Sequence, residues 1–299
     1  MVRPEQYLNP EIARRVKRLD LKAKFIVEGF LVGLHDSPYR GLSLEFSEHR
    51  KYVPGDDPRR LDWTAWAKTD RLYIKTYQAE TNLAAYLLVD TSRSMGYAGA
   101  AGAMTKLEYA TALAAALGYL LTSQNDTVGL GLLGSDLHKL ISPRCSRRQL
   151  VRILAELAQT KAAGVTSLAP GLHAVARRVK RRSLIVLLSD LVDEFSEVLE
   201  ALRRLAFRGH DLVVFQILDP REQNLDMTGP VVLKDPETGA EVATDADHIR
   251  AEYAHRLDAF VQRCRRGVKE LGGDFAVMTT STSFDRALCR FLAERKRRF

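Results

Sequence analysis

The stretch LAAYLLVDTSRSM, residues 83–95, decides the fold of this 299-residue chain. Its first seven residues carry no charge, and the apolar run ends at Asp90. A run so short and so rich in Leu and Val is typical of a strand buried on both faces of a parallel sheet. Open parallel sheets bind ligands beyond the carboxyl ends of their strands, so we expect a functional site to begin at Asp90.

Three oxygen-bearing side chains, Asp90, Ser92 and Ser94, alternate directly after this strand. One carboxylate and two hydroxyls form an oxygen-only set, which suits a hard cation such as Mg²⁺ better than zinc. The alternative interpretation is a polar turn in which Asp90 or Ser94 caps the next helix, because caps favour these residue types.

Strand and helix patterns alternate through the rest of the chain. Apolar strand-like runs lie at residues 127–133, 137–141, 183–190, 211–218 and 275–279, and helical periodicity at 106–123, 147–159, 168–180, 194–207, 249–268 and 284–297. This alternation predicts an α/β fold with a doubly wound, mostly parallel sheet over residues 81–299. Two β-prone runs inside residues 219–246 interrupt the rhythm and predict an inserted hairpin.

The N-terminal segment, residues 1–80, has a different pattern. Apolar residues recur at helical spacing over residues 10–34, and short alternating runs at 42–46 and 72–76 predict strands. We therefore expect a helix and a small antiparallel sheet ahead of the main domain.

Composition argues against several classes of protein. The net charge is +8, but the basic residues are mostly dispersed among acids, which is typical of solvated surfaces rather than a nucleic-acid site. The three cysteines form no CxxC pair, which favours a reducing compartment. The longest apolar stretch, residues 109–121, is too short to span a bilayer. We expect a cytoplasmic protein that binds no nucleic acid and has no membrane span.

Two later residues complete a pattern with the first three. Thr166 precedes a predicted helix, which it could simply cap, and Asp190 ends an apolar strand, where it could be one more polar strand end. Taken together, Asp90, Ser92, Ser94, Thr166 and Asp190 resemble the metal-ion-dependent adhesion site of von Willebrand factor A-type domains. That resemblance implies that the five residues bind Mg²⁺ or Mn²⁺ and leave one position open for an acidic residue of a partner protein.

A second resemblance covers roughly residues 39–299. The stretch at residues 39–80, which contains PGDD and RxxDW at 54–63, is followed by DTSRSM at 90–95 and DPETG at 235–239. This combination is similar to a bacterial family of unknown function with a von Willebrand A-like domain, commonly encoded beside MoxR-type AAA+ ATPases. Ser167 follows Thr166 where relatives usually carry Asp, and Leu191 follows Asp190 where many adhesion domains carry Gly. The resemblance implies a non-enzymatic module that docks on a partner, with a MoxR-type ATPase as the expected partner in a chaperone-like assembly.

The main alternative is an enzyme, a metal-dependent phosphohydrolase with Asp90 as its nucleophile. Haloacid-dehalogenase-like phosphatases use DxDx[TV], and here the second acidic position is Ser92, which is not a general acid at neutral pH. The sequence also contains neither a GxSxG elbow nor a GxxxxGK[ST] loop. A third hypothesis, a basic nucleic-acid-binding protein, depends on the net charge alone.

Overall fold

The computed structural model describes residues 49–51, 73–75, 84–100, 103–164, 167–235 and 239–282. The chain divides into two compact units, one of which is Leu34–Asn82. In that unit two short strands, β1 (His49–Lys51) and β2 (Tyr73–Lys75), pair antiparallel. The strand predicted at 72–76 contains β2. The helices predicted at 10–34 and 284–297, the strand at 42–46 and the motif at 54–63 all lie outside the described residues.

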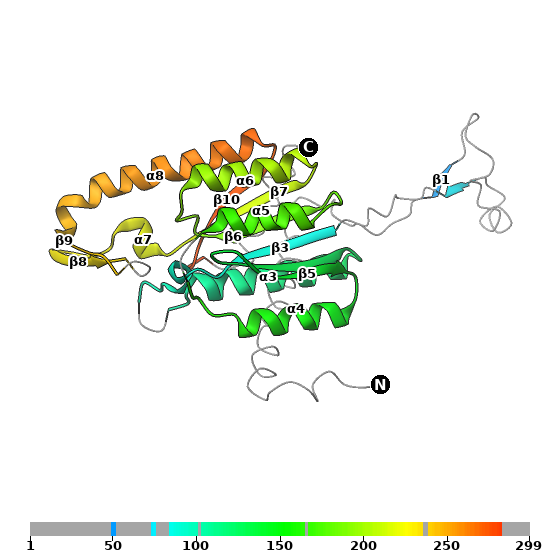
Figure 1. The fold of residues 1–299 in the computed structure, drawn as a ribbon, viewed down its shortest axis with the longest axis horizontal. Coiled ribbons are helices and arrows are strands. Elements are labelled where there is room, and N and C mark those ends of the chain that lie inside the picture. The colour runs from blue at the N-terminus through cyan, green and yellow to red at the C-terminus, as the bar shows by residue number, and fades with distance from the viewer. Residues whose placement is uncertain are drawn as a thin grey trace. The chain divides into compact units, whose positions relative to one another are not determined.

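The other unit is organised around a six-stranded sheet in the order β10-β7-β6-β3-β4-β5 (Figure 1). Only β5 runs antiparallel to its neighbour, and every other pair of neighbouring strands is parallel. This confirms the predicted α/β class with a mostly parallel sheet. The strands are β3 (Ala84–Asp90), β4 (Thr127–Leu133), β5 (Leu137–Arg144), β6 (Leu184–Ser189), β7 (Asp211–Leu218) and β10 (Asp274–Thr279).

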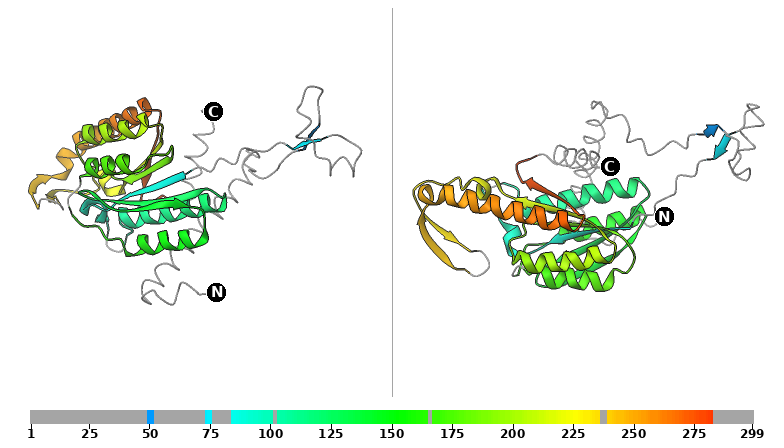
Figure 2. Two further views of the ribbon diagram at one scale, coloured as in Figure 1. Left: turned by 45° about the vertical axis from the view of Figure 1, so that its right-hand side comes forward. Right: turned by 90° about the horizontal axis from the view of Figure 1, so that it is seen from above.

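Helices cover both faces of this sheet, as a doubly wound fold requires (Figure 2). The helices α3 (Lys106–Ser123) and α4 (Arg147–Gln159) pack on one face. The other face is covered by α5 (Leu168–Arg178), α6 (Phe195–Phe207) and α8 (Ala246–Glu270). Successive residues of β3 therefore enter different layers: Leu87 packs in the first and Leu88 in the second, and both are fully buried. This double burial explains why the strand reads as an uninterrupted apolar run.

The order of the strands reverses between β3 and β6. From β3 the chain proceeds outward to β4 and β5, and then crosses back to build β6, β7 and β10 on the other side. Val89 lies opposite Leu188 in the β3–β6 pair, so the two strands end side by side. The loops that follow them leave in different directions, which creates the crevice where doubly wound sheets bind ligands.

The segment 219–246, where the sequence predicts a hairpin, contains the antiparallel strands β8 (Pro230–Lys234) and β9 (Glu241–Asp245). It also contains a short helix that was not predicted, α7 (Pro220–Asn224). Asp219 and Glu222 form a capping box around Pro220, which fixes the start of α7. The segment follows the carboxyl end of β7, so it projects from the edge of the sheet where β3 and β6 end (Figure 1).

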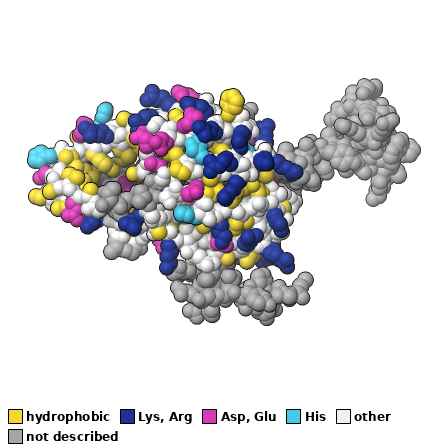
Figure 3. Space-filling view, in the orientation of Figure 1, with side chains coloured by type: hydrophobic (Ala, Val, Ile, Leu, Met, Phe, Trp, Pro, Cys, Tyr) yellow, Lys and Arg dark blue, Asp and Glu magenta, His cyan; other side chains and the backbone are white. Residues whose placement is uncertain are grey.

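The surface is charged but mixed. Lys and Arg side chains are spread over the face shown in Figure 3 rather than gathered in one patch. None of the helices in the described part of the chain combines the length and apolar character needed to cross a membrane.

Candidate functional site

The predicted Asp90 loop is held by hydrogen bonds to its own backbone and to the neighbouring strand. Asp90 is the last residue of β3 and is 1% exposed. Its Oδ1 accepts a hydrogen bond from the backbone N–H of Ser92 (2.9 Å), and its Oδ2 accepts one from the hydroxyl of Ser189 (2.6 Å). The Oγ atoms of Ser92 and Ser94 lie 3.1 Å apart. Three of the predicted site residues are therefore gathered at the end of one strand.

Asp190 lies at the end of the adjacent strand β6 and is fully buried. Its Oδ1 accepts a hydrogen bond from the N–H of Val192 (3.2 Å), and its backbone carbonyl accepts one from the Gln216 side chain (3.2 Å). Burial raises the pKa of the Asp90 carboxyl to about 7; the charge of Asp190 adds to the rise, whereas hydrogen bonds from Ser189 and Ser92 oppose it. The two carboxyl groups are thus close enough to repel each other at the switch point of the sheet.

Thr166, the remaining predicted site residue, lies outside the described residues. The loop that leads to it is nevertheless tied to the Asp90 loop by backbone hydrogen bonds. The N–H of Arg93 donates to the carbonyl of Gly164 (3.2 Å), and that of Ala163 donates to the carbonyl of Thr91 (2.9 Å). Ala163 and Gly164 therefore lie beside the Asp90 loop.

The structure argues against the alternative in which Asp90 or Ser94 caps the next helix. Helix α3 is capped by Thr105, whose hydroxyl accepts from the Glu108 N–H while the Glu108 carboxylate accepts from the Thr105 N–H. A complete capping box therefore satisfies this end of α3. The short 3-10 helix η3 (Arg93–Gly96) directly follows the Asp90 loop, and its N-cap residue is Ser92, so neither Asp90 nor Ser94 is the N-cap of either helix.

Three residues that the sequence analysis missed complete the cluster. Ser189 orients Asp90 and also accepts a hydrogen bond from the Leu191 N–H (2.9 Å). Lys106, the first residue of α3, places its ammonium 2.8 Å from Asp190 Oδ2 and 2.7 Å from Glu222 Oε1. A Lys in the first turn of a helix opposes the helix dipole, and that conflict is the sequence signal that could have singled it out.

The donor set fits a hard cation. Asp90, Ser92, Ser94 and Asp190 offer only oxygen, and the ammonium held at Asp190 indicates that positive charge is favoured here. Among the described residues no three His, Cys, Asp or Glu side chains gather into a metal cluster, so the site would depend on hydroxyls as well as carboxylates. That composition suits Mg²⁺ or Mn²⁺ rather than zinc.

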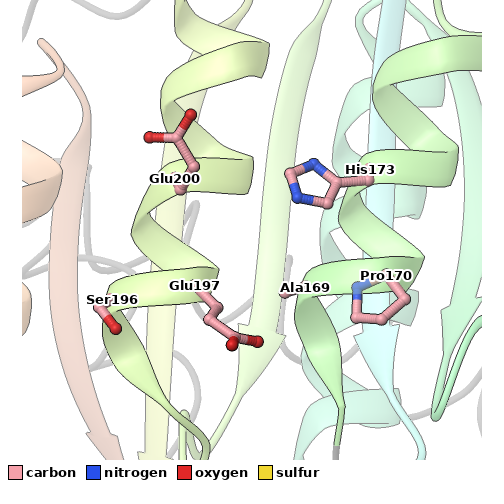
Figure 4. Close-up of a pocket in the computed structure, with 6 residues that line it drawn as sticks. All are labelled: Ala169, Pro170, His173, Ser196, Glu197 and Glu200. Carbon is pink, nitrogen blue, oxygen red and sulfur yellow. The ribbon is translucent and has the colours of Figure 1, made fainter.

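A separate hollow lies between the outer surfaces of α5 and α6 (Figure 4). Its lining includes His173 from α5 and Glu197 and Glu200 from α6. Within the described part of the chain, these side chains form no group that could hold a metal ion. None of the predicted site residues lines the hollow.

Comparison with known proteins identifies relatives along most of the chain. The family model described as "Protein of unknown function DUF58" matches residues 48–262. An uncharacterized protein of Mycobacterium tuberculosis is 30% identical over 298 residues, covering 97% of this chain and 91% of the relative.

Two solved structures are more distant in sequence. The conserved hypothetical protein BatB from Bacteroides thetaiotaomicron is 15% identical with a TM-score of 0.46, covering 72% of this chain and 99% of that one. The SpRpn10 VWA domain is 10% identical with a TM-score of 0.39, covering 69% of this chain and 93% of that one.

Proposed function

This chain belongs to the protein family of unknown function DUF58, and from that premise we propose that it is a metal-ion-dependent protein-interaction module. Asp90, Ser92, Ser94, Thr166 and Asp190 would hold Mg²⁺ or Mn²⁺. The bound ion would supply an open coordination position for an acidic side chain of a partner protein. The site residues act by orienting oxygen atoms and concentrating negative charge, not by transferring protons or groups.

One observation carries this proposal: the Asp90 loop and Asp190 meet at the carboxyl ends of the two central strands. Ser189 and the Ser92 N–H fix the Asp90 carboxylate, and the Val192 N–H helps to fix that of Asp190. The side chain of Val192 is 56% exposed, so the loop that carries the buried Asp190 reaches the surface. Asp90 and Asp190 are themselves buried, so the partner carboxylate would reach the ion from the side of this exposed loop.

The same geometry argues against Asp90 as the nucleophile of a phosphohydrolase. Both of its carboxylate oxygens already accept hydrogen bonds, and its side chain is buried. Ser92, at the position of the expected general acid, is an alcohol that shares a hydrogen bond with Ser94, and a hydroxyl does not act as a general acid at neutral pH. A carboxylate held in this way keeps lone pairs for an ion, but it is not free to turn toward a phosphorus atom as a nucleophile must.

The proposed partner is a MoxR-type AAA+ ATPase of the same cell, and the proposed setting is the cytoplasm. The partner comes from the family resemblance, and the setting comes from the composition of the sequence. The client of such an assembly would be a further protein.

The test measures binding of the purified full-length chain to the purified MoxR-type ATPase of the same organism, in Mg²⁺ and in EDTA. For wild type, we expect Kd in EDTA to be at least tenfold higher than Kd in Mg²⁺. Asp90→Asn keeps the shape of the side chain, and its Kd in Mg²⁺ should be at least tenfold higher than that of wild type. The matched control is Asp258→Ala, which removes a carboxylate from the exposed surface of α8 and should leave Kd unchanged.

We prefer Asp90→Asn to Asp190→Ala as the test variant. Removing the Asp190 carboxylate would leave the buried ammonium of Lys106 paired with Glu222 alone. Circular dichroism should show the same fold for all variants. Equal affinity of wild type and Asp90→Asn in Mg²⁺ would refute metal-dependent docking on this ATPase, and a direct Mg²⁺ titration by calorimetry would then show whether the metal or the partner is wrong.

A further inference from the structure

Lys106 is the most unusual residue of the site. Its side chain is 1% exposed, and lysine is almost never fully buried unless it is paired. Two carboxylates, Asp190 at 2.8 Å and Glu222 at 2.7 Å, pair with its ammonium, and the Tyr97 ring lies 5.7 Å from it. These partners compensate for a cation at the amino end of α3, where the helix dipole disfavours positive charge.

The ammonium is paired on two sides. The Nζ of Lys106 donates to Asp190 Oδ2 and to Glu222 Oε1, so its charge is compensated although the side chain is buried. The ammonium therefore occupies one oxygen of Asp190, which is also a proposed ligand of the metal ion. An ammonium and a divalent cation that share one buried carboxylate repel each other strongly, because the low local dielectric screens them little.

The second partner, Glu222, would keep the Lys106 ammonium paired after it leaves Asp190. Glu222 lies on α7 and is 25% exposed, whereas Asp190 is fully buried. The Tyr253 hydroxyl of α8 donates to the backbone carbonyl of Glu222 (2.6 Å), which fixes α7 beside the cluster. An ammonium that leaves Asp190 would thus keep a salt bridge at the root of the segment carrying β8 and β9.

We propose that Lys106 is a built-in competitor for the cation site, which a divalent ion must displace from Asp190 onto Glu222. This inference rests on the proposed function, since it takes Asp190 as a metal ligand, and it names how the same site is regulated. Metal binding becomes coupled to α7 and to the projecting hairpin, so the state of the site is transmitted to a surface that a partner could contact.

The experiment titrates Mg²⁺ into the full-length protein by calorimetry. Lys106→Met should bind Mg²⁺ at least tenfold more tightly than wild type, and Glu222→Gln at least threefold more weakly, because Asp190 then becomes the ammonium's only carboxylate partner of the two. Two matched controls should stay within twofold of wild type. Lys234→Met removes a lysine from an exposed salt bridge on the hairpin, and Glu108→Gln removes a carboxylate from the first turn of α3 while keeping a capping side chain.

Hydrogen–deuterium exchange of residues 220–224 gives a second readout. Mg²⁺ should change the exchange of this segment in wild type and leave it unchanged in Lys106→Met. If Lys106→Met does not fold, Lys106→Met/Glu222→Gln is compared with Glu222→Gln, and the same tenfold gain is expected.

The outcomes separate the two proposals. If wild type and Lys106→Met bind Mg²⁺ equally, the competitor role is refuted while the metal site stands. If neither folded protein binds Mg²⁺, both proposals are refuted. Tight binding by Lys106→Met alone supports the competitor role and identifies the ammonium as the reason that wild type binds weakly.

Discussion

Leu191 offers a sharp test of how the site is shaped. It follows Asp190 and has a φ of 59°, in the left-handed region that costs most L-residues about 1–2 kcal/mol. This turn lets the Leu191 N–H reach Ser189 and the Val192 N–H reach Asp190. The Leu191 side chain is itself fully buried, in the layer formed by α5 and α6. The residue therefore combines backbone strain with a side chain that the core needs.

Two substitutions at position 191 separate these contributions. Leu191→Ala removes buried side-chain atoms, which costs about 2–5 kcal/mol, and keeps the strain. Leu191→Gly loses the same contacts but relieves the strain, and the greater entropy of the unfolded chain cancels only about 0.5–1 kcal/mol of that relief. We expect Leu191→Gly to be more stable than Leu191→Ala by up to about 1.5 kcal/mol, measured by urea unfolding in EDTA.

Leu188 provides the matched control. It is also fully buried but lies within β6 and is not among the described residues with positive φ. There the usual order should hold, with Ala more stable than Gly by about 1 kcal/mol. The same order at both positions would refute the left-handed turn after Asp190.

Two further predictions concern buried polar groups. Ser189→Ala should lower the free energy of unfolding by about 3–5 kcal/mol in urea, because it removes a hydrogen bond to the Asp90 carboxylate and leaves the Leu191 N–H unpaired; the exposed Ser196→Ala should change it by less than about 0.5 kcal/mol. Burial lowers the pKa of His210 below its usual 6.5, so its contribution to stability is fully present above pH 6.5 and is lost as pH falls through the lowered value. Between pH 7.5 and pH 5.0 the free energy of unfolding should therefore fall less in His210→Asn than in wild type. An equal fall in both proteins would show that His210 does not contribute to the loss of stability in acid.

The fold was largely predictable because its signals are local. The ranges predicted for α3, β4, α4 and β7 agree with the structure residue for residue. The two helices each bury an apolar face against the sheet and the two strands lie within it, so the apolar pattern of each element is complete within its own sequence. Helix α7 was missed because five residues are too few for periodicity, although its Asp-Pro start and the Glu222 capping partner were visible.

The site was less predictable than the fold, for a physical reason. The motif named Asp90, Ser92, Ser94 and Asp190, and the pairing of β3 with β6 brings their two strand ends together. The contacts of Lys106 reach 84 residues along the chain to Asp190 and 116 residues to Glu222. No local pattern encodes separations of that size: the unfavourable position of Lys106 at the amino end of its helix was visible in the sequence, but its partners were not.

A motif of this kind predicts which ligand a site accepts but not how tightly the site binds it. Oxygen side chains in a fixed order specify the kind of ligand, because their chemistry selects hard cations whatever surrounds them. Affinity depends on the total charge around the ligand, and here Lys106 offsets one of the negative charges that the motif supplies. Two chains with the same five motif residues could therefore differ widely in Mg²⁺ affinity according to what lies at the first position of α3. On the proposal made above, the ammonium of Lys106, a cation that the chain itself carries, would help to set how strongly this site binds a metal ion.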